Sequence, residues 1–398
     1  MTPRIRKRLF DALRIAICGA AIWFVIQGVT VKDHITLKNG QGELIGTVVG
    51  DGDPMTIVLV GGEQRTVSSE DIALDEQGQP RVALGLGTAW RNSGKGLLLL
   101  AVLLHFPVTF LQSIRLKWLL GAQAIRMGYG ECVKFTFAGN FLNFVTPLGS
   151  HAGDVFKAFF VSKHTKRKTE AVTTIALDRA IGLGTLIVSV AVISTISTAG
   201  GRLAEFRPYV LTVFGIGVVG LLVYFSKTLR KYCFLGNWLA RLPIAQQLLR
   251  IDQAAHALAT HKRVLVGAVL ATVALQILAV GAYFTVAVGL AMDAHIGNML
   301  EYFAYFYTGA VIQALPGPPQ GLGTVELAYR YFLSSFGNAS QIICVAFLIR
   351  IVVLVCSLPG LIITLTGSYR PRNSIRLADG PRAVASTLPE SKSDLATS

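Results

Sequence analysis

The sequence has few charged residues, and acidic residues are scarcer than basic ones. Of its 398 residues, 15% are charged and 52% are hydrophobic, whereas soluble domains have roughly 25% charged residues. There are 37 Lys and Arg against 22 Asp and Glu, a formal net charge of +15. Nucleic-acid binding would require a basic face on a soluble module, and no such module is visible. The composition indicates an integral membrane protein whose basic residues gather in cytoplasmic loops.

Motifs for catalysis, metal binding and cofactor binding are missing as well. The five cysteines show no CxxC spacing, and none lies in the segment that we expect outside the membrane, so no disulfide framework is predicted. The sequence contains no HExxH, GxSxG or Walker A motif. We therefore expect no catalytic set, no metal and no cofactor.

The first and last segments of the chain differ from its apolar middle. Residues 2–8 are basic and precede an apolar run at about 15–29. A cleaved signal peptide would need a small-residue cleavage site, which is not cleanly present, so we expect residues 1–29 to hold a retained transmembrane helix. Its basic flank predicts a cytoplasmic N-terminus. Residues 367–398 are polar and rich in Ser and Pro, which predicts a disordered cytoplasmic tail.

Residues 30–93 have the pattern of a small β structure. Short alternating segments at 34–37, 44–49 and 55–60 are separated by turns rich in Gly, Asn and Asp. The segment holds nine acidic residues and five Lys and Arg. We expect a small β-rich extracytoplasmic insert, which is also a possible binding surface for an extracytoplasmic partner.

Residues 94–366 carry further apolar segments, which we divide into halves at about 94–200 and 206–366. Spanning helices are predicted at about 95–120, 170–197, 208–226, 264–290 and 341–366. Arg115, Lys117 and Arg126 place the end of the first of these helices in the cytoplasm, as the basic run 163–168 does for the next loop. Within 227–263, apolar residues at spacings of three and four predict an amphipathic helix on the cytoplasmic side.

Two apolar stretches, 131–162 and 298–337, are interrupted and fit re-entrant hairpins better than spans. Their breaks contain Pro147, Gly149 and Gly153 in the first stretch and Pro319, Gly321 and Gly323 in the second. Interrupted segments at matching places in two inverted halves indicate the midplane site of a transporter. The predicted fold is an all-α polytopic membrane protein, with an inverted repeat of about six spanning helices plus two re-entrant helical hairpins. Chance interruption is the alternative, because glycine and proline are common in membrane helices.

The few polar residues near the breaks are the candidates for substrate binding, since burying a charge in a membrane costs several kcal/mol unless it is paired or hydrated. These candidates are Asp154, Lys157, Asp178, Arg179, Glu326, Arg330 and Arg350, with His151 and Asn143 at the first break. Arg179 and Arg350 lie inside the membrane in opposite halves, where guanidinium groups could each hold two phosphate oxygens. Helix N-termini after the breaks would add donors for the same anion.

Structural ion pairing is the alternative for two pairs of these residues. Asp154 and Lys157 have the i,i+3 spacing of an intrahelical pair, and Glu326 and Arg330 have the i,i+4 spacing.

The other candidates have equally plain alternatives. Asp178 and Arg179 are neighbours that diverge on a helix, so each needs a partner elsewhere, such as in the hairpins. His151 could be a polar cap. Asn143, like Asn140, is expected to hydrogen-bond unwound backbone.

Taken in order, several motifs resemble a known family, the flippase-like transmembrane domain of lysylphosphatidylglycerol synthases and its stand-alone homologues. Over roughly 95–366 they are Arg115-x-Lys117-Trp118-Leu119-Leu120, Asn143 to Pro147, Gly153-Asp154-x-x-Lys157, Leu177-Asp178-Arg179, Pro319-Gln320-Gly321-Leu322-Gly323-x-x-Glu326 and Leu348-Ile349-Arg350. Asp154 and Lys157 stand where the family has Glu and Arg, and Asp178 stands where it has Glu. The β-rich insert is not part of the resemblance.

The resemblance implies lipid translocation between membrane leaflets. It does not imply lysine transfer, because only a short and largely polar tail, residues 367–398, follows the last apolar segment. We expect a stand-alone flippase-like transporter of the inner membrane that moves a phosphate-headgroup or polyprenyl-phosphate-linked lipid. One alternative is a membrane-embedded transferase acting on a lipid headgroup, with Asp154, Glu326 and His151 as acid and base. Another is a membrane anchor that presents residues 30–93 to a partner.

Overall fold

The computed structural model describes residues 32–38, 42–49, 54–59, 61–73, 82–83, 85, 88, 91, 93–146, 151–197, 201–225, 260–314, 321–337 and 339–366. The predicted N-terminal helix, nearly all of the predicted amphipathic segment and the predicted tail lie outside these residues. So do the break residues Pro147, Gly149 and Pro319.

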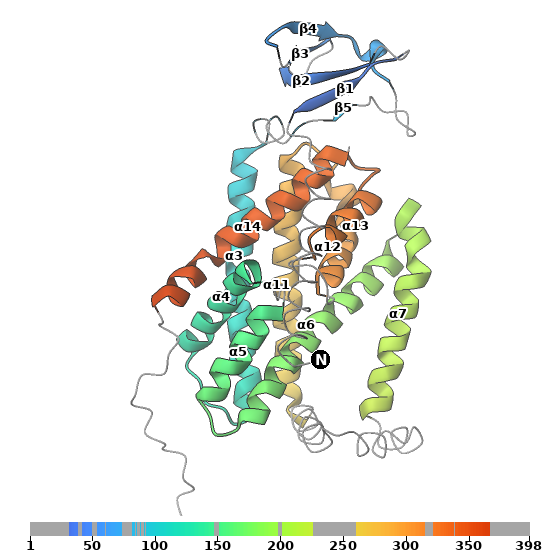
Figure 1. The fold of residues 1–398 in the computed structure, drawn as a ribbon. Helices are drawn as coiled ribbons and strands as arrows, with labels where there is room; N and C mark the ends of the chain where they lie inside the picture. The colour runs from blue at the N-terminus through green and yellow to red at the C-terminus, as the bar shows by residue number, and fades with distance from the viewer. Residues whose placement is uncertain are drawn as a thin grey trace, which may run out of the picture.

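A five-stranded antiparallel sheet occupies one end of the molecule (Figure 1). Its strands are β1 (Asp33–Thr36), β2 (Glu43–Val49), β3 (Met55–Leu59), β4 (Gln64–Val67) and β5 (Val82–Ala83), in the order β4-β3-β2-β1-β5. The first three strands form the hairpins that the alternating segments predicted. Ile35, Ile57, Val67 and Ile72 are buried together as the small core of this sheet.

The rest of the described chain is helical. The helices are α3 (Lys95–Ala122), α4 (Tyr129–Val145), α5 (Ala152–Lys163), α6 (Lys168–Ile196), α7 (Gly201–Phe225), α11 (Lys262–Gly289), α12 (Met299–Ala314), α13 (Thr324–Phe332) and α14 (Ala339–Thr366), with short 3-10 turns η2 (Ser69–Asp71) and η4 (Ile296–Asn298). Five of them, α3, α6, α7, α11 and α14, are long and apolar enough to cross a membrane. A helix of 28 residues extends about 42 Å, more than the ~30 Å hydrocarbon core of a bilayer. The chain is therefore predominantly helical, with several candidate membrane spans.

Both predicted interruptions separate two short helices. The first stretch contains α4 and α5, and the second contains α12 and α13. Within each pair the two helices pack against each other, and the second helix of each pair also packs against the long helix that follows it. After each break, a short helix therefore begins next to the long helices.

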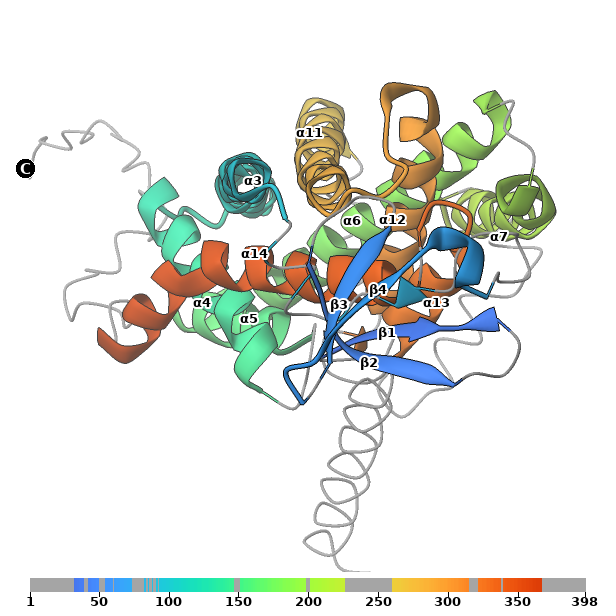
Figure 2. The same cartoon turned by 90° about the horizontal axis from the view of Figure 1, so that it is seen from above.

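The long helices α3 and α11 pack side by side along one side of the bundle (Figure 2). Helix α4 packs against α14, and α12 packs against α6. Helix α7 packs mainly against α6 and lies at the periphery. This arrangement leaves α3, α6, α11 and α14 around one central region.

Two glycine contacts bring α4 close to its neighbours. A Cβ on Gly153 of α5 would lie only 2.6 Å from the carbonyl carbon of Gly139 on α4. A Cβ on Gly360 of α14 would lie 2.6 Å from the carbonyl carbon of Phe137, also on α4. Small residues at such crossings are typical of membrane helices, whose association depends on close packing.

Asp33 joins the sheet to the segment that leads into α3. Its carboxylate is fully buried and accepts hydrogen bonds from the backbone N–H groups of Val48 and Gly85. It also accepts a hydrogen bond of 2.7 Å from the hydroxyl of Thr88. The Asp33 side chain therefore links β1 and β2 to the segment between β5 and α3.

Candidate functional site

A cavity of about 350 Å³ lies in the central region of the bundle. Helices α3, α4, α5, α6, α11, α12, α13 and α14 all contribute side chains to its wall. On α3 the lining begins at His105 and ends at Leu116, which are separated by about 16 Å of helix. The cavity is therefore long enough to hold more than a single phosphate group.

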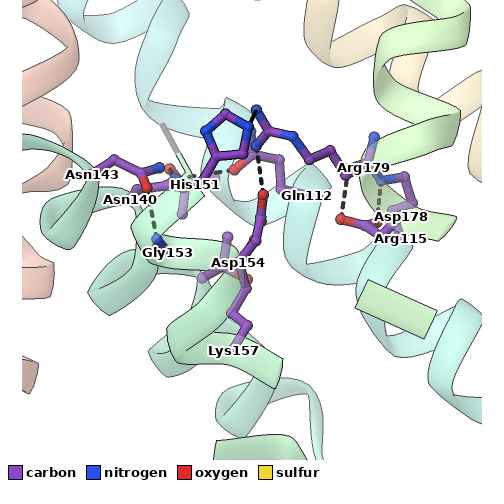
Figure 3. A network of polar contacts seen from close by, with 12 residues as sticks. Gln112, Arg115, Asn140, Asn143, His151, Gly153, Asp154, Lys157, Asp178 and Arg179 are labelled. Atoms are coloured by element: carbon purple, nitrogen blue, oxygen red, sulfur yellow. Dashed lines mark hydrogen bonds and ion pairs between the residues drawn. The ribbon is translucent and has the colours of Figure 1, made fainter. Parts of the chain in front are cut away.

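Arg115 and Asp178 form a buried ion pair across the cavity wall (Figure 3). Arg115 Nε donates to Asp178 Oδ1 at 2.6 Å and Nη2 donates to Oδ2 at 2.9 Å. The remaining nitrogen, Nη1, donates to the hydroxyl of Thr272 on α11 at 2.9 Å. This geometry fixes α3, α6 and α11 to one another.

The interpretation of Arg115 as a cytoplasmic flank residue was wrong. Its side chain is 7% exposed, whereas the nearby Lys117 is exposed as expected of a flank. Both lie near the end of the same apolar helix, but they face different directions because neighbouring positions on a helix diverge.

Arg179 reaches both helix pairs. Its Nη1 donates to Asp154 Oδ2 on α5 at 2.5 Å, and its Nη2 donates to the carbonyl oxygen of Ala314 on α12 at 3.1 Å. The same Nη2 lies 3.5 Å from Nε2 of His151. The predicted intrahelical pair is also present, because Lys157 Nζ lies 3.1 Å from Asp154 Oδ1. Asp154 thus accepts from two cations at once (Figure 3).

Arg350 of α14 forms an ion pair with Glu326 of α13. The other oxygen of Glu326, Oε2, accepts a 2.8 Å hydrogen bond from the backbone N–H of Gly323 and so caps α13. Gly321 and Gly323 have φ values of +64° and +85°, a region that favours glycine. The predicted pairing of Glu326 with Arg330 was wrong: Arg330 is exposed, and the described residues give it no ion pair.

The asparagines of α4 behave as predicted in part. Asn143 Oδ1 accepts a 2.7 Å hydrogen bond from the backbone N–H of Gly153, so it caps the start of α5 after the break. Asn140 instead donates to side chains of α3, the hydroxyl of Thr109 and the amide oxygen of Gln112.

Most of the predicted site residues meet in this cavity. The lining contains Asn143, Asp154, Lys157, Asp178, Arg179 and Arg350. Glu326 and His151 lie directly behind the lining as partners of its arginines, and Arg330 lies away from it.

Several further polar lining residues were missed, among them Arg115, Thr272 and Gln276. Gln276 donates to the carbonyl oxygen of Gly182 at 3.1 Å. Thr272 and Gln276 are polar residues one helical turn apart in the middle of an apolar span, and that pattern is itself a signal of a polar interior face. Among the described residues, no group of three or more His, Cys, Asp and Glu is placed to hold a metal ion.

Comparison with known proteins supports the resemblance of the motifs. A family model described as the lysylphosphatidylglycerol synthase TM region matches residues 85–360. This match includes the cavity-lining residues of both helix pairs. The comparison with curated proteins finds no match. The chain belongs to the family of the lysylphosphatidylglycerol synthase TM region and is a multi-pass membrane protein.

Proposed function

We propose that this protein is a flippase-like lipid transporter without catalytic activity of its own. It would move a phosphate-headgroup or polyprenyl-phosphate-linked lipid between the leaflets of the inner membrane. The observation that carries this proposal is the placement of Arg179 and Arg350 in one cavity. Each arginine is paired with a carboxylate near the start of a short helix that follows a break, Asp154 on α5 and Glu326 on α13.

The spacing of these pairs supports an inverted repeat. Asp154 precedes Arg179 by 25 residues, and Glu326 precedes Arg350 by 24 residues. The packing of α4 against α14 and of α12 against α6 is reciprocal, as a two-fold relation between the halves would produce. In the proposed topology, α4–α5 and α12–α13 are re-entrant hairpins, and the cavity between them opens to each leaflet in turn.

The charges around the cavity favour an anionic group. Four basic side chains and three acidic ones take part: Arg115, Lys157, Arg179 and Arg350 against Asp154, Asp178 and Glu326. One positive charge is left over, and a phosphodiester would neutralise it. The N-termini of α5 and α13 add favourable dipoles.

These same ion pairs favour transport over group transfer. Asp154 and Glu326, the acid and base candidates of a transferase, are both held as paired carboxylates. His151 contacts Arg179, which already carries a positive charge.

The proposed orientation places the sheet on the extracytoplasmic side. Basic residues gather at the opposite end of the helices, where α3 ends and α6 and α11 begin: Lys117, Arg126, Arg167, Lys168, Lys262 and Arg263. An excess of Lys and Arg marks the cytoplasmic side, and we place both chain termini there too.

Transport can be measured with the full-length chain reconstituted in vesicles that contain a fluorescent phosphodiester lipid. An impermeant reductant then reports which leaflet holds the lipid. Relative to wild type, Arg179→Gln and Arg350→Gln should each slow translocation by about tenfold or more, since each removes a charge-assisted fork for phosphate. Arg330→Gln is the matched control, because Arg330 is exposed and lies outside the cavity.

Wild-type vesicles that exchange lipid no faster than empty vesicles would refute the transport proposal. Mass spectrometry of the recovered lipid tests the alternative, because a chemically altered headgroup would indicate a transferase. The melting temperature of each variant in detergent should be recorded, so that loss of transport is not confused with loss of folding.

A further inference from the structure

The two ends of the cavity differ in chemistry. Arg115 and Thr272 are hydrogen-bonded at one end of the paired helices α3 and α11. His105 and Tyr283 stack at the other end, with ring centroids 5.8 Å apart. The two contacts are separated by about 15 Å of helix, since Arg115 follows His105 by ten positions on α3. We call the cluster with Arg115, Asp154, Lys157, Asp178 and Arg179 the charged end.

The opposite end is lined by His105, Tyr283, Tyr307 and Tyr329, and we call it the neutral end. Helix α12 also extends from the charged end to the neutral end. Ala314 contacts Arg179 at the charged end, and Tyr307, seven residues earlier, lies about 10 Å from Ala314 along the helix.

Polar atoms at the neutral end are without partners in the part of the chain that the structure describes. His105 is 7% exposed, and its Nδ1 is buried without a hydrogen bond. Tyr307 and Tyr329 are each 3% exposed, and the described residues provide no hydrogen bond to their hydroxyl groups. Buried polar groups are nearly always hydrogen-bonded, so a cluster that lines a cavity without protein partners indicates a ligand with donors and acceptors.

The rings at the neutral end are held firmly in place. Phe306 packs edge-to-face against both Tyr283 and Tyr329, with ring centroids 5.9 Å and 5.3 Å away. Gly309 gives Tyr329 room beside α12, because a Cβ at 309 would lie 2.7 Å from the Tyr329 hydroxyl oxygen. Such pre-ordered rings lose little entropy when a ligand binds.

We propose that the neutral end binds the hydroxyl groups of an uncharged polyol headgroup, a glycerol or a sugar, whose phosphate is held by the arginines of the cavity. This inference rests on the proposed transport function and specifies its substrate class. A polyol both donates and accepts hydrogen bonds, as histidine and tyrosine side chains do. Its CH groups can also lie against the aromatic rings.

An ammonium headgroup fits this end less well. Among the lining residues that the structure describes near His105 and the tyrosines there is no carboxylate, and Glu326, one helical turn before Tyr329, is already paired with Arg350. The phosphodiester of the lipid offsets the one positive charge that the described ion pairs leave over, so an ammonium group would add a positive charge that the cavity does not balance.

The test compares the binding of two short-chain lipids to the full-length protein in detergent. Dioctanoyl phosphatidylglycerol and dioctanoyl phosphatidylethanol carry the same phosphodiester charge, but only the first has free hydroxyl groups. We expect wild type to bind the glycerol lipid about tenfold more tightly, since one or two net hydrogen bonds have that effect. Two further arms, dioctanoyl phosphatidylinositol and phosphatidylethanolamine, compare a ring polyol and an ammonium headgroup.

Two variants remove polar atoms and keep the rings: His105→Phe and Tyr329→Phe. Each should reduce the ratio between the two affinities to about threefold or less and leave the affinity for phosphatidylethanol unchanged. Tyr302→Phe is the matched control, because the Tyr302 hydroxyl donates to the carbonyl oxygen of Asp293 and Tyr302 does not line the cavity.

The possible failures can be distinguished. Equal affinity of wild type for the two lipids, or an unchanged ratio in both variants, would overturn the assignment of the neutral end and leave transport intact. Tighter binding of phosphatidylethanolamine would overturn it in favour of an ammonium group. If none of the lipids binds to wild type, this proposal and the transport proposal both fail.

Discussion

Removing one partner of the buried Arg115–Asp178 pair should be far more harmful than removing both. Arg115→Met leaves the Asp178 carboxylate buried without a cation. Asp178→Leu leaves the guanidinium with only its hydrogen bond to Thr272. Each single substitution removes the two hydrogen bonds between the ions, at about 1.5–3 kcal/mol each. An uncompensated buried charge costs about 3–5 kcal/mol. Both estimates give a loss of about 4 kcal/mol in the free energy of unfolding for each single variant.

The free energy of unfolding of the double variant, Arg115→Met with Asp178→Leu, should differ from that of wild type by only about 1 kcal/mol. It replaces the pair with apolar side chains of similar volume and leaves no buried charge. Thr272 keeps a partner, because its hydroxyl already donates to the carbonyl oxygen of Ala268.

The assay is reversible unfolding in mixed micelles with increasing dodecyl sulfate, followed by tryptophan fluorescence. We expect the double variant to be more stable than either single variant, a strong positive coupling between the two sites. A double variant destabilised by the sum of the two single effects would refute the reasoning. So would single effects below about 1 kcal/mol, which are typical of an exposed pair.

Two smaller predictions concern packing and the sheet. Gly153→Ala should destabilise the protein by about 1–3 kcal/mol, because its Cβ would clash with the Gly139 carbonyl group. Gly184→Ala on α6 is the control and should be neutral or slightly stabilising, because a Cβ there would meet nothing within 4 Å. Equal melting temperatures of the two variants would contradict this prediction. Asp33→Ala should leave the Gly85 and Val48 N–H groups without their acceptor, which costs about 1–3 kcal/mol for each group left unsatisfied. Limited proteolysis between the sheet and α3 should then accelerate, and an unchanged cleavage rate would show that Asp33 is dispensable.

The interrupted segments could be predicted from sequence because local chemistry determines them. Glycine and proline disfavour a continuing helix wherever they cluster. Helix α13 starts directly after Gly321 and Gly323 of the predicted break. Helix α5 starts at Ala152, so Gly153, which was predicted as part of the first break, lies in the first turn of the helix, where Asn143 accepts its N–H. The β segments were equally local, since alternation and turn residues lie next to one another in the sequence.

The partners of the charged residues were harder to predict, because they depend on tertiary packing. Glu326 has a basic residue one helical turn away, yet it pairs with Arg350, which comes from another helix. Sequence spacing shows which side chains share a helix face, but not which face is turned to the neighbouring helix. For the same reason Arg115 was assigned to a cytoplasmic flank, although α3 turns this side chain toward α6 and α11.

The pairing of the cavity arginines with carboxylates has a consequence for the proposed transport cycle. A guanidinium group at membrane depth is costly without a counter-charge, and Asp154 and Glu326 supply that charge when no lipid headgroup is bound. An entering phosphate must share or replace these bonds, so its net binding free energy is the difference between two similar interactions. Binding is then weak enough for release. Because each half has its own arginine and carboxylate, the same exchange is available on the approach from either leaflet.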